Sequence, residues 1–345
     1  MRNNEERVVL WALDKKIKIN NITNILNLDY SIEVDYLSNH DIGPNDKKLL
    51  NNWEFEEIKE YNGVKFIKSK AIIEKKVPEE KAFLVINGKK ELLPKNRRIN
   101  SYSIPVYFIE YKETVYSVTK CCKYLESTLR GSLMGQSNKT NNHLKSAWKN
   151  IQSNKIPKFY FNSDFFFWII NLRNQILATT IGDIEILDIK NVADYDKEKS
   201  KGHHNYGDNI LNDATTKTAI GIKNNLEMIG LHLKSETIDC HFSIDKNSKI
   251  LLNNKSYLLE NEEIIPYSEQ NLYKYLINTY FFIIPSLVDE YVKEKANGDW
   301  TTSISEKKYR KWAIESIEMI AKELGIELIK NYEDLKQIRK IKIEK

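Results

Sequence analysis

The hydrophobic pattern changes its period near residue 120, and this change constrains the fold more than any other feature of the sequence. Before it, short apolar segments bounded by charged or turn residues are typical of strands, and they lie at 8–13, 64–68, 82–86, 105–111 and 114–119. Asn87 and Gly88 predict a hairpin turn, because both residues tolerate positive φ. After residue 120 the pattern becomes mainly helical. The sequence therefore predicts an α+β fold.

Two helices of the second half are predicted from particular residues. Asn162 or Ser163 can cap a helix whose aromatic run 165–168 must be largely buried. A second, amphipathic helix is predicted because apolar residues recur at steps of three, four and three, at Ala219, Ile222, Leu226 and Ile229. We expect a strand-rich α+β domain at 1–118, a mixed α/β, nucleic-acid-binding domain at 119–262 and a helical C-terminal region at 263–345.

Composition excludes several classes of protein. Three cysteines, two of them adjacent at 121 and 122, cannot form the disulfide framework of a small secreted domain. The N-terminus has no long apolar stretch followed by a cleavage site, and the apolar run at 280–288 is too short to cross a bilayer. We therefore expect an intracellular, cytoplasmic protein with reduced thiols and no membrane span.

Residues 127–163 form the clearest anomaly, since they contain no acidic residue in a chain that is 29% charged. The net charge of the whole chain is only +5, from 53 basic and 48 acidic residues. Phosphate binding favours such a one-sided segment, because a nearby carboxylate would cancel the gain from released counterions. The predicted phosphate ligands are Arg130, Lys139, Lys145, Lys149, Lys155 and Lys158.

An alternative interpretation of this segment is structural. Leu144, Trp148 and Ile151 have the spacing of a buried helical stripe, which would leave the lysines on the wet face. Trp148 is then a core residue and not a stacking platform. The lysines are available to phosphate in either case.

Two further basic stretches contribute candidate ligands. The stretch at 89–100 carries Arg97 and Arg98 on a predicted surface loop, where such residues grip a backbone or are merely solvated. At 215–225, Lys217 lies near a predicted helix N-terminus, whose free amides favour phosphate.

A competing class is a metal-dependent nuclease of the PD-(D/E)xK type. Asp188 and Lys190 are two residues apart on a predicted strand and so share a face, and Asp164 has the spacing of a first acid. A nuclease of this type requires Mg²⁺ as cofactor, whereas the binding protein requires none. About seven acid-x-Lys matches are expected by chance in this composition. His203 and His204 lie in a predicted flexible loop and do not by themselves indicate a metal site.

The stretches 60–82, 103–129 and 215–244 resemble, in order and strand character, DNA-binding phage-exclusion and defence proteins of the RexA and KwaB (Kiwa) type. The resemblance implies a protein of bacterial anti-phage defence, or abortive infection, that recognises foreign DNA and acts through a partner protein. It transfers no catalytic residue.

We therefore expect a cytoplasmic protein that binds the backbone of DNA or RNA. A third class is an oligomerising interaction subunit, in which Trp300 and Trp312 either line a contact between copies or belong to an ordinary helical core. Whether the chain is an enzyme is left open by the sequence.

Overall fold

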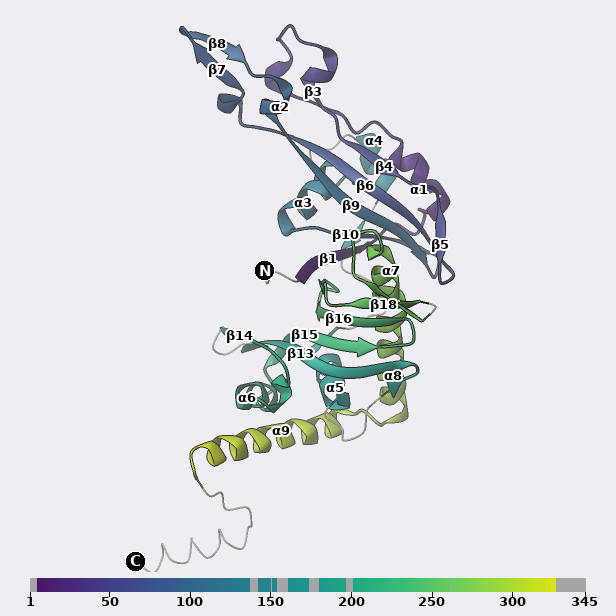
Figure 1. Ribbon diagram of the computed structural model, residues 1–345, viewed down its shortest axis with the longest axis vertical. Helices are drawn as coiled ribbons and strands as arrows, with labels where there is room; N and C mark the ends of the chain where they lie inside the picture. The colour runs from purple at the N-terminus through teal and green to yellow at the C-terminus, as the bar shows by residue number, and fades with distance from the viewer. Residues whose placement is uncertain are drawn as a thin grey trace, which may run out of the picture. The chain divides into compact units, whose positions relative to one another are not determined.

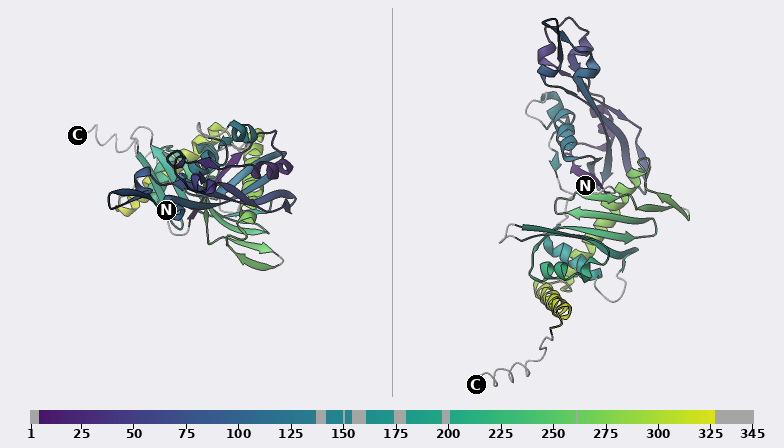
Figure 2. Two further views of the ribbon diagram at one scale, coloured as in Figure 1. Left: turned by 90° about the horizontal axis from the view of Figure 1, so that it is seen from above. Right: turned by 60° about the vertical axis from the view of Figure 1, so that its left-hand side comes forward.

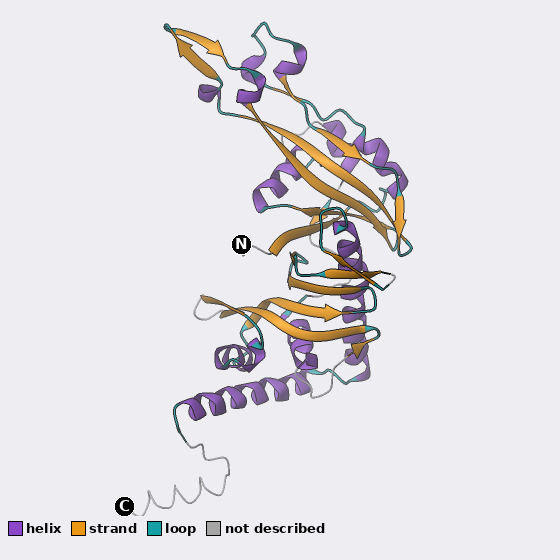
Figure 3. Ribbon diagram, in the orientation of Figure 1, coloured by secondary structure: helices purple, strands orange, loops and turns teal. Residues whose placement is uncertain are grey.

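The computed structural model describes residues 5–136, 142–149, 151–153, 161–173, 180–196, 201–260 and 262–326. The described elements are helices and antiparallel strands, which confirms the α+β class (Figure 3). The chain folds into two compact units, each made of two stretches of sequence. Unit 1 comprises Met1–Phe159 and Thr237–Ser286, and unit 2 comprises Tyr160–Glu236 and Leu287–Lys345.

An antiparallel sheet forms the body of unit 1. Its strand order is β16-β17-β1-β10-β9-β6-β4, with bounds Ile238–Asp245, Ile250–Asn253, Glu5–Ala12, Thr114–Lys120, Ile99–Tyr111, Val64–Lys76 and Asn52–Phe55. Shorter strands pair at its margins, namely β5 (Lys59–Tyr61), β11 (Gln152–Ser153), β18 (Tyr257–Glu260) and β19 (Glu263–Pro266). β6 and β9 pair over almost the full length of β6, from Lys65 opposite Glu110 to Lys76 opposite Ile99.

Three helices pack on one face of this sheet and close its core: α1 (Ile19–Leu26), α3 (Lys123–Ser132) and α4 (Asn142–Trp148). Figure 2 shows α3 and α4 beside the long strands. The ring of Trp148 lies 5.8 Å from that of Phe108 on β9 and 6.0 Å from that of Trp53 on β4. Trp148 is fully buried, so the structural interpretation of this residue is confirmed. Helix α7 (Leu272–Ile277) and a π-helical turn (Asn278–Ile283) complete the unit.

Two small ribbons are separate from the main sheet. One pairs β2 (Ile32–Glu33) with β3 (Lys48–Leu49), and the other pairs β7 (Phe83–Ile86) with β8 (Lys89–Leu92). Asn87 and Gly88 join β7 to β8 with φ of 50° and 77°, which confirms the predicted hairpin. The β7–β8 ribbon projects from the rest of unit 1, and the short helix α2 (Lys95–Arg98) follows it (Figure 1).

Unit 2 packs helices against a small antiparallel sheet. Its strands are β12 (Thr180–Ile181), β13 (Ile184–Asp196), β14 (Lys201–Tyr206) and β15 (Asn225–Lys234), and its helices are α5 (Ser163–Arg173), α6 (Ala214–Gly221), α8 (Ile284–Asn297) and α9 (Thr302–Glu323). Asn162 caps α5 by accepting from the amide of Phe165, and residues 165–172 are all buried, as predicted. Among the described helices, none combines the length and the apolarity that crossing a bilayer requires.

The amphipathic helix predicted over 219–229 is wrong. α6 ends at Gly221, Lys223 has a φ of 62°, and Leu226 and Ile229 lie on strand β15. Pairing with β13 satisfies the backbone of β15 and buries both side chains, so tertiary contacts override the local spacing. Ile222, which the pattern placed on the buried face, is 57% exposed.

The close packing of α6 on α9 requires glycine at position 221. A Cβ at Gly221 would lie 2.6 Å from the backbone of Ala313. We expect Gly221→Ala to destabilise the protein by about 1–3 kcal/mol, because the two helices must separate. Thermal unfolding followed by circular dichroism should show a lower midpoint. Gly43→Ala is the control, since its Cβ would make an ordinary contact of 3.5 Å; equal midpoints for the two variants would contradict this prediction.

Candidate nucleic-acid interface

A cleft of about 580 Å³ opens in unit 1 beside α3. Part of its lining comes from residues 127–163, the segment without acidic residues, which we call the carboxylate-free segment. The lining residues from it are Ser127, Thr128, Gly131 and Ser132 on α3 and Leu144 on α4. These residues offer hydroxyl groups and an apolar surface. Lys75 and Lys76, at the end of β6, add two ammonium groups. The volume lies within the range of about 300–1,000 Å³ that small-molecule sites occupy.

Tyr124 is the most exposed aromatic residue of this cleft, with 55% of its surface accessible. The ammonium of Lys75 donates a hydrogen bond of 2.9 Å to its hydroxyl and lies 4.1 Å from its ring centre. The hydrogen bond from Lys75 lowers the pKa of Tyr124. The ring of Tyr102 meets it edge-on at 6.3 Å. An exposed aromatic ring held between a lysine and a second aromatic ring is suited to stacking on a base.

The remaining lining of the cleft is acidic. Asp29, Glu33 and Asp35 contribute to it, and the backbone amide of Ser31 donates to Asp29 at 2.9 Å. That hydrogen bond lowers the pKa of Asp29. The cleft thus combines cations, carboxylates and an aromatic ring. A nucleotide offers groups for each, since its phosphate attracts lysines and its exocyclic amines donate to carboxylates.

The carboxylate-free segment is partly brought together by the fold. The turn that follows α3 contacts α4 at Gly135, where a Cβ would lie 2.9 Å from the carbonyl oxygen of Leu144. Arg130 on α3 and Lys145 and Lys149, on and directly after α4, therefore come from adjoining parts of unit 1, and Lys149 is exposed. The predicted ligands Lys139, Lys155 and Lys158 lie outside the described residues.

Arg130 is a predicted phosphate ligand, but in the structure it packs against the core of unit 1. Its guanidinium lies 5.8 Å from the ring centre of Trp11 on β1, and its Nε is buried without a hydrogen-bond partner among the described residues. Trp148 donates to the hydroxyl of Tyr30 at 3.1 Å, inside the core. Two lysines of the carboxylate-free segment lie among the described residues. Lys145 is half-buried and Lys149 is exposed.

The structure does not support Arg98 and Lys217 as phosphate ligands, whereas Arg97 is exposed as predicted. Arg98 is 3% exposed and donates to the backbone carbonyls of Leu93 and of the distant Asp46, so it holds two segments together and is not available to a phosphate. The ammonium of Lys217 lies 2.6 Å from Glu315 and 5.4 Å from the ring centre of Trp312, where only 12% of the side chain is exposed. An acid distant in sequence neutralises it. Asp213 caps α6 by accepting from the amide of Thr216.

The structure brings together only two of the three predicted nuclease residues. Asp188 and Lys190 share a face as predicted, with 2.6 Å between ammonium and carboxylate, but Lys190 also pairs with Asp208 at 2.6 Å. Asp164 does not join them. Its carboxylate accepts from the Tyr291 hydroxyl, from Lys295 and from the Trp300 indole. Within the described ranges, no group of three or more potential metal ligands includes Asp164 or Asp188.

The two adjacent histidines lie on strand β14 and not in the predicted flexible loop. His203 lies opposite Asp194 of β13 in the sheet register, and its Nδ1 is 3.2 Å from the buried carboxylate. His204 contacts Asn191 at 2.6 Å. Sequence reasoning missed Asp194, because nothing in its neighbourhood marks it as buried. The two histidines therefore have sheet partners and are not free in a loop.

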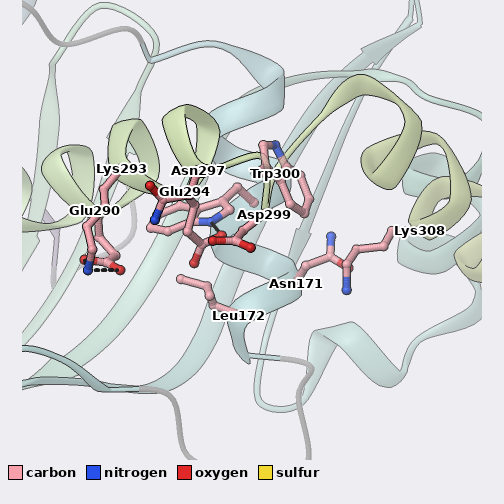
Figure 4. Close-up of a pocket in the computed structure, with 10 residues that line it drawn as sticks. Asn171, Leu172, Glu290, Lys293, Glu294, Asn297, Asp299, Trp300 and Lys308 are labelled. Atoms are coloured by element: carbon pink, nitrogen blue, oxygen red, sulfur yellow. Dashed lines mark hydrogen bonds and ion pairs between the residues drawn. The ribbon is translucent and has the colours of Figure 1, made fainter.

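Unit 2 contains a pocket of about 400 Å³ that sequence reasoning did not identify (Figure 4). The carboxylates of Glu294 and Asp299 point into the same part of it, and Trp168 donates to Glu294 at 2.8 Å. Glu290 also lines it and pairs with Lys293 at 3.0 Å. Trp300, another lining residue, is 4% exposed, which supports the helical-core interpretation of this tryptophan and of Trp312. Three carboxylates make the pocket unfavourable for phosphate.

Comparison of the chain with family models, with curated proteins and with solved structures yields no match. The resemblance to the RexA and KwaB type therefore stays a prediction. In the structure, the stretch 60–82 contains β6, and the stretch 103–129 contains most of β9, all of β10 and the start of α3. These elements form the centre of unit 1.

The contact between Lys75 and Tyr124 predicts a measurable titration. In Lys75→Ala the hydrogen bond to the phenol is lost, so the pKa of Tyr124 should rise. NMR of ring-labelled tyrosines over a pH series checks this, with Tyr124→Phe assigning the signal. Lys59→Ala, which removes a lysine paired with Glu56, serves as control. An unchanged Tyr124 titration in Lys75→Ala would show that the contact does not form in solution.

Proposed function

We propose that this protein binds single-stranded nucleic acid through unit 1. Lys75, Lys76 and Lys149 contact phosphates, and Tyr124 stacks on an unpaired base. One observation carries the proposal: an exposed aromatic ring, held by a lysine, stands at a cleft lined in part by the carboxylate-free segment of α3 and α4. Arg97 extends the cationic surface beyond the cleft.

The contacts of these lysines support their proposed role as phosphate ligands. Within the described residues, Lys75, Lys76 and Lys149 form no ion pair with a carboxylate; Lys75 contacts Tyr124, and Lys76 lies 5.4 Å from the ring centre of Tyr36. In contrast, Lys217, Lys223 and Lys274 each pair directly with a glutamate. A cation without an acidic partner binds phosphate without first losing an ion pair.

The acidic part of the cleft supports a single-stranded ligand over a duplex. Asp29 and Glu33 repel phosphates but accept hydrogen bonds from exocyclic base amines. Those amines reach a cleft only when the base is unpaired, and stacking on Tyr124 has the same requirement. A nucleotide whose phosphate lies at the lysines and whose base enters the cleft satisfies both parts of the lining.

The resemblance of the central strands supplies the proposed setting. We place the protein in the cytoplasm of a bacterium, in anti-phage defence, where single-stranded DNA or RNA marks a replicating or damaged foreign genome. Action through a partner protein agrees with the incomplete nuclease constellation, in which Asp164 is held by α8 and Trp300. Binding should be only modestly selective for sequence, because backbone contacts carry no sequence information.

Salt dependence tests the lysines directly. We expect the triple variant Lys75→Ala, Lys76→Ala, Lys149→Ala to bind a single-stranded oligonucleotide more weakly. The slope of log affinity against log salt should fall in magnitude by about 2, since each phosphate contact contributes about 0.7. Fluorescence anisotropy at several salt concentrations measures both quantities.

The matched control for this experiment removes the same charge elsewhere. Lys59→Ala, Lys293→Ala and Lys311→Ala together delete three exposed lysines that each pair with a glutamate. This control should keep the wild-type slope. If both triple variants change the slope equally, binding follows net charge alone and the proposed interface is wrong.

A further inference from the structure

Strand β7 exposes three consecutive apolar side chains on the ribbon that projects from unit 1 (Figure 1). Leu84, Val85 and Ile86 are 51%, 64% and 42% exposed. A run of three exposed apolar residues is unfavourable in water unless it serves a contact. The base of the ribbon packs against unit 1, since the ring of Phe83 lies 5.4 Å from that of His40 and 6.2 Å from that of Tyr36. The three exposed side chains make no such contact, which indicates that this strand has a partner.

The two edges of the ribbon differ in charge. β8 carries Lys89, Lys90 and Glu91, all exposed, and charged side chains on an edge strand oppose pairing with another strand. β7 carries no charge, and no strand within the described part of the chain pairs with its outer edge. The outer edge of β7 is therefore the one that accepts a further strand.

The register of the hairpin shows which backbone groups face outward. Ile86 and Lys89 flank the two-residue turn and lie opposite each other, and residues in this position exchange both hydrogen bonds. Because the pattern alternates along a strand, the amide and carbonyl of Val85 point away from β8. Val85 is thus at the centre of the open edge.

We propose that β7 pairs antiparallel with β7 of a second copy of this chain, about a twofold axis at Val85. Val85 then lies opposite Val85 of the partner subunit, and Leu84 lies opposite Ile86 of the partner subunit. A twofold interface uses the same surface on both copies, so an uncharged apolar strand complements itself. The two ribbons form a four-stranded sheet whose outer strands are the charged β8 strands.

The charge distribution favours a second copy over a nucleic acid as the occupant of this edge. Phosphates require cations, and the lysines of the ribbon lie on β8 and not on the uncharged strand. Pairing through β7 leaves Lys89 and Lys90 on the outside of the assembly. It also leaves the cleft residues Lys75 and Tyr124 out of the interface.

The mass of the full chain, measured by light scattering after size-exclusion chromatography over a range of concentrations, tests this pairing. Wild type should have twice the single-chain mass of 40.5 kDa. Val85→Pro removes the outward amide and Val85→Lys charges the edge, so both should halve the mass. Val85→Thr keeps the amide and the strand preference and should remain dimeric.

The β7 pairing is overturned if wild type has the single-chain mass at every concentration, or if Val85→Pro and Val85→Lys both remain dimeric. It is also overturned if wild type is monomeric while Val85→Lys alters oligonucleotide affinity, which would assign the strand to nucleic acid. Circular dichroism establishes that each variant is folded, and Val85→Lys keeps the test valid if proline disturbs the hairpin.

Discussion

The packing of Trp148 fixes the part of unit 1 on which the proposed function depends. Its ring contacts those of Phe108 on β9 and Trp53 on β4, which also contact each other, and its indole donates to Tyr30. A buried tryptophan of this kind is worth about 3–5 kcal/mol. It holds α4 on the sheet, and the turn after α3 contacts α4 at Gly135, so the position of α4 beside the cleft depends on this side chain.

Partners distant in sequence decide which cations are available to a ligand. Lys217 is neutralised by Glu315, and Arg98 is occupied by the carbonyls of Leu93 and Asp46. Lys75, by contrast, contacts an exposed tyrosine. A basic stretch in a sequence therefore overestimates the number of phosphate ligands, because folding pairs many lysines before any ligand arrives. The cations that stay without an acid define the interface.

Some features followed from local physics and were predictable. The Asn87-Gly88 turn requires positive φ, the cap at Asn162 begins the aromatic helix, and Trp148 has the spacing of a buried stripe. Other features depend on contacts that no local pattern contains. The need for glycine at position 221 reflects the approach of Ala313, and the acidic lining of the cleft comes from residues about 90 positions before α3. Tyr124 carried a weak signal, since it follows two cysteines at a strand-to-helix transition.

The most direct measurement of the central claim is photocrosslinking of the full chain to a single-stranded oligonucleotide that contains 5-iodouracil, with the linked peptides identified by mass spectrometry. Crosslinking reports aromatic side chains in contact with the base. Stacking in the cleft predicts that the main linked residue is Tyr124, with Tyr102 as a minor product. Crosslinks confined to unit 2, or to aromatic residues outside the cleft, would contradict it.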